Sequence, residues 1–149
     1  MSRHCETCGS FLYDAIGEQK PERGRIGSPA DAYLLLRRKL ARARQEKLIA
    51  IYLDAQNRMI GSPVVISVGA LNTTRTQPRE LLAPAIKRAA ASIIIAHNHP
   101  SGSLEPSNDD IAFTRTMIAA AELMGFTLYD HLIISRKGYI SLRDKGHLT

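Results

Sequence analysis

Apolar residues recur at helical spacing in three stretches of this chain, and each stretch begins with residues that favour a helix start. Residues 28–31 read Ser-Pro-Ala-Asp, which offers an N-cap hydroxyl, a proline at the first helical position and an acid in the first turn. Pro78 and Ser107 begin the other two stretches, and Gly125 ends the last. The pattern predicts three helices, from 28, from 78 to about 91 and from 107 to 124, that bury Tyr33, Leu36, Leu40 and Ala43, then Leu81, Leu82, Ala85, Ile86 and Ala89, then Ile111, Thr114, Ile118, Ala121 and Met124.

Short β-rich runs separate these helices. Residues 48–53 and 59–68 lie on either side of a polar turn and predict a hairpin, and Ser92 to Ala96 predicts a strand. Three closing stretches, 126–128, 132–135 and 139–142, follow the last helix. The order α-β-β-α-β-α-β-β contains no internal repeat and predicts an α/β (α+β) fold with a central sheet and helices packed against it.

The length of 149 residues suits one domain, and no apolar run approaches the roughly 20 residues of a membrane span. Residues 1–27 show no apolar periodicity, so we expect a flexible leader followed by a folded domain over 28–149. The leader contains Cys5 and Cys8 in a Cys-x-x-Cys pair, which is compatible with an incidental sequence, with a metal shared with His4 or a partner chain, or with a redox-active pair. Without a secretory signal we expect a cytoplasmic protein that does not engage membranes; the sequence does not indicate an oligomeric state.

Positive charge is concentrated in one segment. The chain carries a formal net charge of +6, and residues 30–49 contain Arg37, Arg38, Arg42 and Arg44 with few acids. Such a run is most often a solvated helix face. It is also where DNA would bind if the protein has a nucleic-acid partner.

One stretch carries candidate chemistry. His97 and His99 lie two residues apart at a predicted strand end, so both imidazoles project to the same side and can share one ion. Asp110 falls in the first turn of the next helix and can reach the same ion, which leaves a fourth position for water, as in catalytic zinc sites. The alternative is structural: Ser107 and Asp110 can cap the helix, and His-Pro-Ser-Gly can be a turn.

At these residues the sequence resembles a known family. His97-x-His99, seven intervening residues and Ser107-x-x-Asp110 match the JAMM zinc motif of JAB/MPN-domain metalloproteins. The fuller match over His97 to Gly102, with Pro106-Ser107, Leu123-x-Gly125 and the run Asp130-His131-Leu132-Ile133-Ile134, resembles the RadC-like branch and covers about residues 28–146.

The resemblance implies a JAB/MPN fold related to cytidine deaminases, with one Zn²⁺ held by His97, His99 and Asp110. It also implies a glutamate that handles the proton of a zinc-activated water, a place that Glu46 occupies, and a role for Ser107 in stabilising the oxyanion. We therefore expect a metallopeptidase or isopeptidase that hydrolyses an amide bond of a peptide or protein.

Two other functions stay open at this stage. One is a nucleic-acid-binding module associated with DNA repair, as the RadC name suggests, and the other is a non-catalytic JAB scaffold. A deaminase is excluded because that chemistry uses His-x-Glu followed by Pro-Cys-x-x-Cys, whereas His99 stands at the third position here and no cysteine follows Cys8. Asp130 and His131 match the family without an assigned role: support of the metal site and a buried turn are both possible.

Overall fold

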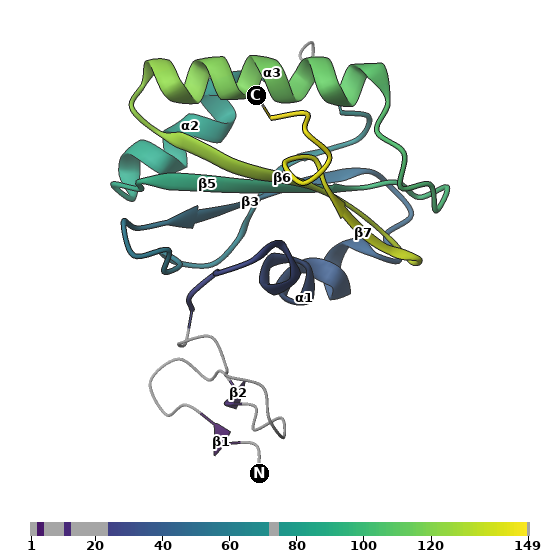
Figure 1. Ribbon diagram of the computed structural model, residues 1–149, viewed down its shortest axis with the longest axis horizontal. Helices are drawn as coiled ribbons and strands as arrows, with labels where there is room; N and C mark the ends of the chain where they lie inside the picture. Colours follow the sequence, from purple (N-terminus) through teal and green to yellow (C-terminus); the bar gives the residue numbers. More distant parts are fainter. Residues whose placement is uncertain (1–2, 5–10, 13–23, 72–74, 149) are drawn as a thin grey trace.

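The computed structural model describes residues 3–4, 11–12, 24–71 and 75–148 (Figure 1). Two short strands, β1 (Arg3–His4) and β2 (Phe11–Leu12), pair antiparallel near the N-terminus. Cys5 and Cys8 lie outside the described residues. Within the described part, no helix is long and apolar enough to cross a membrane.

A five-stranded mixed sheet forms the centre of the molecule, in the order β4-β3-β5-β6-β7. Only β5 and β6 pair in parallel; the other neighbours, including the predicted hairpin of β3 and β4, are antiparallel. Figure 1 shows α1 on one face of the sheet and α2 and α3 on the other. The elements are α1 (Pro29–Leu40), β3 (Lys47–Leu53), β4 (Val64–Val68), α2 (Pro78–Lys87), β5 (Ser92–Asn98), α3 (Asn108–Leu123), β6 (Thr127–Ser135) and β7 (Gly138–Ser141).

The inner strands β3 and β5 are buried on both faces because helices cover both faces of the sheet. Successive residues of a strand point to opposite sides, so the apolar run of β5 divides between two cores. Ile93 and Ile95 pack under α2 and α3, whereas Ile94 and Ala96 pack against α1. Ile26, which precedes the helix start at Ser28, also belongs to the core beneath α1.

The helical stripes differ from the prediction in detail. Ile86 and Met124, expected to be buried, are 56% and 52% exposed. The helix α2 ends at Lys87, and Ala89 beyond it is exposed with a left-handed backbone. The inner side of α3 is rotated relative to the predicted stripe, because Phe113 and Met117 pack into the core beneath this helix. The residues that α3 buries are Asp110, Phe113, Thr114, Met117 and Ala121.

The last part of the chain departs most from the prediction. Residues 127–135 form one continuous strand, so the turn considered for Asp130 and His131 does not exist. Ile93 pairs with Leu128 but Ile94 pairs with Asp130, which leaves Tyr129 as an extra residue in β6. Such a bulge reverses the alternation of faces. As a result Leu128 and His131, three residues apart, both face α3.

Candidate metal centre

Two consecutive side chains at the end of β5 point to opposite faces of the sheet. His97 follows Ile93 and Ile95 onto the α3 face and is fully buried. Asn98 points toward the loop after α1, where its Nδ2 donates to the carbonyls of Ala43 and Gln45 at 3.3 and 3.0 Å and its Oδ1 accepts the N–H of Lys47 at 2.7 Å. Asn98 thus pins both sides of Glu46. The spacing of the motif did not reveal this contact, because its partners lie more than fifty residues away along the chain.

The start of α3 supplies the third residue of the group through a capping box. Oγ of Ser107 accepts the N–H of Asp110 at 3.0 Å, and Oδ2 of Asp110 accepts the N–H of Ser107 at 2.9 Å. The helix cap considered from the sequence is therefore present. It does not compete with a metal site, because the same carboxylate also meets the two histidines.

Three ligand atoms converge at this point. Nε2 of His97 lies 3.0 Å from Nε2 of His99 and 3.3 Å from Oδ1 of Asp110, and Nε2 of His99 lies 3.0 Å from Oδ2 of Asp110. A tetrahedral zinc ion with bonds of about 2.0–2.1 Å separates its ligand atoms by roughly 3.3 Å. One ligand atom from each of the three residues lies within 4.8 Å of the other two, so two imidazole nitrogens and one carboxylate could hold a divalent metal ion of the zinc type.

The electrostatics of the group favour a cation. Burial opposes the charged form of Asp110, but the neighbouring imidazoles of His97 and His99 and the N–H of Ser107 outweigh it and hold the pKa of the carboxyl below its ordinary value of 3.8. The hydrogen bond to Asp110 raises the pKa of His99 above 6.5, although burial acts in the other direction, and Glu46 contributes to the rise. A proton on Nε2 of His99 and a metal ion would therefore compete for the same position.

The loop after β5 orients His99. Its Nδ1 lies 3.0 Å from the carbonyl of Ser103, which can only accept, so Nδ1 carries the proton and Nε2 is left for a ligand bond. The turn depends on Gly102, whose N–H donates to the His99 carbonyl and whose φ is +89°. At this φ any residue with a Cβ is strained, and its Cβ would also lie 3.0 Å from the Arg136 guanidinium, so a larger residue is disfavoured in this turn.

A second group of polar side chains is buried behind His97. His131, which is fully buried, lies 2.7 Å from Nδ1 of His97 through its Nε2 and 2.6 Å from Oγ1 of Thr114 through its Nδ1. Burial lowers the pKa of His131 well below 6.5, so the ring is neutral at physiological pH. Sequence reasoning assigned Thr114 to the apolar core and left His131 without a role; only the family motif at 130–134 pointed to the latter.

Asp130, the neighbour of His131, has a structural role. Its carboxylate accepts the Ser141 hydroxyl at 2.6 Å and the N–H groups of His131 and Arg143 at 2.7 and 3.2 Å. Burial raises its pKa, against these hydrogen bonds. Asp130 therefore ties β6 to the end of β7, on the face of the sheet opposite to the metal-ligand group.

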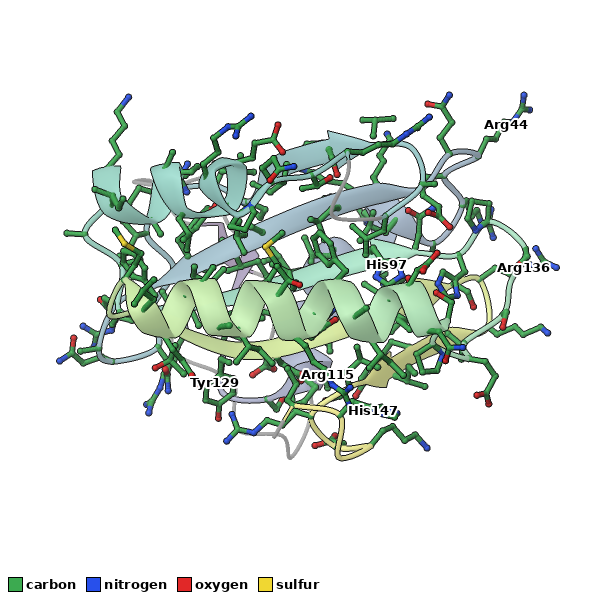
Figure 2. The ribbon with its side chains drawn as sticks, turned by 90° about the horizontal axis from the view of Figure 1, so that it is seen from above. Arg44, His97, Arg115, Tyr129, Arg136 and His147 are labelled. Atoms are coloured by element: carbon green, nitrogen blue, oxygen red, sulfur yellow. The ribbon has the colours of Figure 1, made fainter. Side chains whose placement is uncertain are left out.

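An open cavity of about 360 Å³ reaches His99 and Asp110 of the metal-ligand group. It is lined by Glu46, Ala70, Leu71, His99, Pro100, Ser101, Ser107, Asp109 and Asp110, whereas His97 lies behind it. Oε2 of Glu46 accepts the N–H of Leu71 at 3.0 Å, which directs the carboxylate to this cavity. The structure thus brings every predicted site residue to one place. Figure 2 shows His97 behind the first turns of α3, with Arg44 and Arg136 extending outward at the same end of the molecule.

The basic residues expected to face DNA lie on α1 and in the loop after it. Arg37, Arg38, Arg42 and Arg44 are all exposed. Among the described residues no ion pair to an acid is recorded for any of them.

The fold and the site define an α/β domain with a mixed sheet and a buried His-His-Asp group that could hold a metal ion at the end of a central strand. The model of the RadC-like JAB domain family matches residues 26–147, and the chain belongs to this family. The fold class expected from the resemblance is confirmed.

The names of three similar curated proteins state no activity. The chain is similar to a UPF0758 protein of Methanosarcina mazei, at 40% identity over 86% of this chain and 55% of the relative. It is also similar to a UPF0758 protein of Aquifex aeolicus, at 46% identity over 83% of this chain and 52% of the relative, and to one of Bacillus cereus, at 38% over 83% and 54%. The chain spans about half the length of these relatives.

Proposed function

We propose that this protein is a zinc-dependent metallopeptidase or isopeptidase that hydrolyses an amide bond in the cavity beside α3. The observation that carries the proposal is that Glu46 and Ser107 line the same cavity as His99 and Asp110. An acid-base group, a hydroxyl donor and the metal ligands then face one substrate position, as amide hydrolysis requires.

His97, His99 and Asp110 would hold the ion. Two neutral imidazoles and one carboxylate leave a fourth position open to the cavity, the arrangement of catalytic zinc. Bound zinc would supply a Lewis acid that lowers the pKa of a water molecule to about 7. Because the Asp110 carboxyl stays ionised and His97 is sealed from solvent, the ligand group is ready for a cation at neutral pH.

Glu46 accepts the proton of the attacking water and delivers it to the leaving amine. Its position favours this role, since the Leu71 N–H holds one carboxylate oxygen and Asn98 fixes the chain on both sides of the residue. The carboxylate is near enough to His99 to raise its pKa, which places its charge beside the ligand group. A carboxylate in this position can transfer protons in both directions during one turnover.

Ser107 donates a hydrogen bond to the substrate carbonyl oxygen as negative charge develops on it. The cap occupies a lone pair of Oγ, because the Asp110 N–H is the donor. The hydroxyl proton is therefore available, and one serine can both cap α3 and stabilise an oxyanion.

The test compares the zinc-loaded protein with Glu46→Gln on fluorescein-labelled casein, on a mixture of synthetic peptides and on a peptide branched through a lysine ε-amide. We expect equal zinc content and a loss of cleavage of about 10²- to 10⁴-fold in the variant, the usual contribution of a proton-transfer group. Unchanged cleavage by Glu46→Gln would refute the assignment of Glu46. Stoichiometric zinc with no cleavage of any probe by either protein would favour the non-catalytic scaffold.

A second candidate function is DNA binding through α1, favoured by the exposure of Arg37, Arg38, Arg42 and Arg44 without a recorded acidic partner in the described part of the chain. This surface would bind a duplex through its phosphates, so affinity should fall steeply with salt. Fluorescence anisotropy with a labelled duplex at low salt tests the idea. Weaker binding by the double variant Arg38→Gln with Arg42→Gln supports it, and absence of binding by the wild type removes it.

A further inference from the structure

A buried chain of hydrogen bonds begins at the ring of His97 and returns to the backbone of Asp110. Nδ1 of His97 lies 2.7 Å from Nε2 of His131, and Nδ1 of His131 lies 2.6 Å from Oγ1 of Thr114. Oγ1 of Thr114 donates to the carbonyl of Asp110 at 2.7 Å. Each of the four residues is at most 4% exposed, so water does not compete for these bonds.

The last bond determines the direction of all the others. A carbonyl oxygen can only accept, so the single hydroxyl proton of Thr114 is committed to Asp110. Oγ1 of Thr114 must then accept, and Nδ1 of His131 is its donor. A neutral imidazole with a proton on Nδ1 has its lone pair on Nε2, so Nδ1 of His97 donates to His131.

We propose that His131 and Thr114 are positioning residues that hold His97 in the tautomer protonated at Nδ1, with the lone pair on the Nε2 atom that meets His99 and Asp110. The inference rests on the metal site of the proposed function and does not depend on the reaction. A free imidazole divides its population between two tautomers, and only one of them can use Nε2 as a ligand. The hydrogen-bonded chain of side chains therefore excludes the other tautomer even without a bound ion.

The chain ends in a backbone carbonyl, which has no proton to pass on. It therefore orients His97 and does not conduct protons to or from the site. It also connects two ligands: His97 on β5 is linked through His131 on β6 and Thr114 on α3 to the main chain of Asp110. A substitution of Thr114 should therefore alter the orientation of both His97 and Asp110, although Thr114 lies outside the group that can hold the metal.

The direct test is NMR on protein labelled with ¹⁵N-histidine, in the zinc-loaded and zinc-free states at pH 8. We expect long-range ¹H–¹⁵N correlations to show both His97 and His131 protonated at Nδ1, with slowly exchanging ring protons. A proton on Nε2 of His131 in the wild type would overturn the proposal. This measurement needs no variant, so it remains decisive if a substitution prevents folding.

Variants measure the consequence for the site. Thr114→Val removes the hydroxyl at almost constant shape, and we expect zinc affinity, from competition with a chromophoric chelator, to fall about 10- to 100-fold. Thr114→Ser keeps the hydroxyl and should remain within a few-fold of the wild type. Thr116→Val is the matched control, because Thr116 makes the same hydroxyl-to-carbonyl bond to Ala112 on the exposed side of α3.

The proposal fails if folded Thr114→Val binds zinc as tightly as Thr116→Val, or if Thr114→Ser is as weak as Thr114→Val. Both measurements proceed without a substrate. Absence of amide hydrolysis would therefore refute the proposed function and leave this inference standing, whereas a wrong tautomer would refute this inference and leave the hydrolase intact.

Discussion

Asp110 and Ser107 cap α3 reciprocally, each accepting the backbone N–H of the other, at 2.9 and 3.0 Å. The same Asp110 carboxylate lies within 3.3 Å of both histidines. A helix start and a metal ligand are thus one residue, so the cap directs the carboxylate to the ligand position before any ion is present. This arrangement reconciles the two interpretations that the sequence left open.

The two roles of Asp110 can be separated by substitution. Asp110→Asn retains an oxygen for the Ser107 N–H but removes the charge, whereas Asp110→Ala removes both. We expect both variants to lose more zinc affinity than the roughly 10- to 100-fold that a supporting hydrogen bond contributes. In thermal unfolding of the zinc-free proteins, the free energy of unfolding of Asp110→Ala should be about 1 kcal/mol lower than that of Asp110→Asn, the value of one hydrogen bond.

Asp109→Asn is the control for Asp110, since it removes a neighbouring charge from the same first turn of α3, where Asp109 is exposed and Asp110 is buried. Its zinc affinity should stay close to that of the wild type. Equal loss of zinc in Asp109→Asn and Asp110→Asn would show that general charge, and not ligation, attracts the ion.

Ser107→Gly should separate capping from catalysis. Glycine is tolerated at an N-cap at a cost of a few tenths of a kcal/mol, but it has no hydroxyl to donate. We expect nearly unchanged stability and a fall of about 10²- to 10³-fold in kcat, the contribution of an oxyanion donor. Ser28→Gly is matched to it, because Ser28 caps α1 through the N–H of Asp31 in the same manner, away from the cavity. Equal kcat in the two variants would exclude the oxyanion role of Ser107.

Zinc affinity should depend on pH through His99. The pKa of this residue is raised above 6.5 by Asp110, and zinc can bind only the unprotonated ring. At pH values below that raised pKa each bound ion displaces one proton, so apparent affinity should fall about tenfold per pH unit, starting above pH 6.5. Chelator competition between pH 5.5 and 8.5 measures this slope; a flat profile would contradict it.

The zinc-free protein should show the opposite trend in stability. A raised pKa in the folded state means that protonated His99 contributes stability below pH 6.5 that is lost as pH rises through the folded value. Ionised Asp110, whose pKa is lowered in the folded state, contributes stability that is fully present above pH 3.8 and is lost only as the pH falls through the folded pKa. Urea denaturation should therefore show the advantage of wild type over His99→Gln to be greatest between about pH 4 and 6.5 and to decline above it.

Ser141→Ala should destabilise the fold and leave the site intact. It removes the 2.6 Å hydrogen bond to the buried Asp130 carboxylate, which then lacks one of its three donors. We expect a loss of about 1–3 kcal/mol in the free energy of unfolding, the cost of an unsatisfied buried group. Ser135→Ala in the same hairpin should cost less, because its partner is the Lys137 N–H in an exposed turn. Zinc affinity of the folded Ser141→Ala protein should match the wild type.

The contact between Asn98 and the backbone on both sides of Glu46 could not be predicted from local sequence. The place of Glu46 between the first helix and the first sheet strand could be read from the family resemblance. Its orientation depends on Asn98 and on the Leu71 N–H, which come from distant parts of the chain. No periodicity or spacing encodes such contacts.

The order of the three helices and of the strands between Lys47 and Asn98, and the grouping of His97, His99 and Asp110, could be predicted from the sequence alone. Helix caps, apolar periodicity and the two-residue repeat of a strand are properties of neighbouring residues, so they survive without knowledge of the fold. His131 and Thr114 needed the tertiary structure. The bulge at Tyr129 decides that His131, and not Asp130, faces α3, and it exists only in the pairing of β6 with β5. A register between strands is a long-range relationship, and a shift of one residue exchanges the two faces of the sheet.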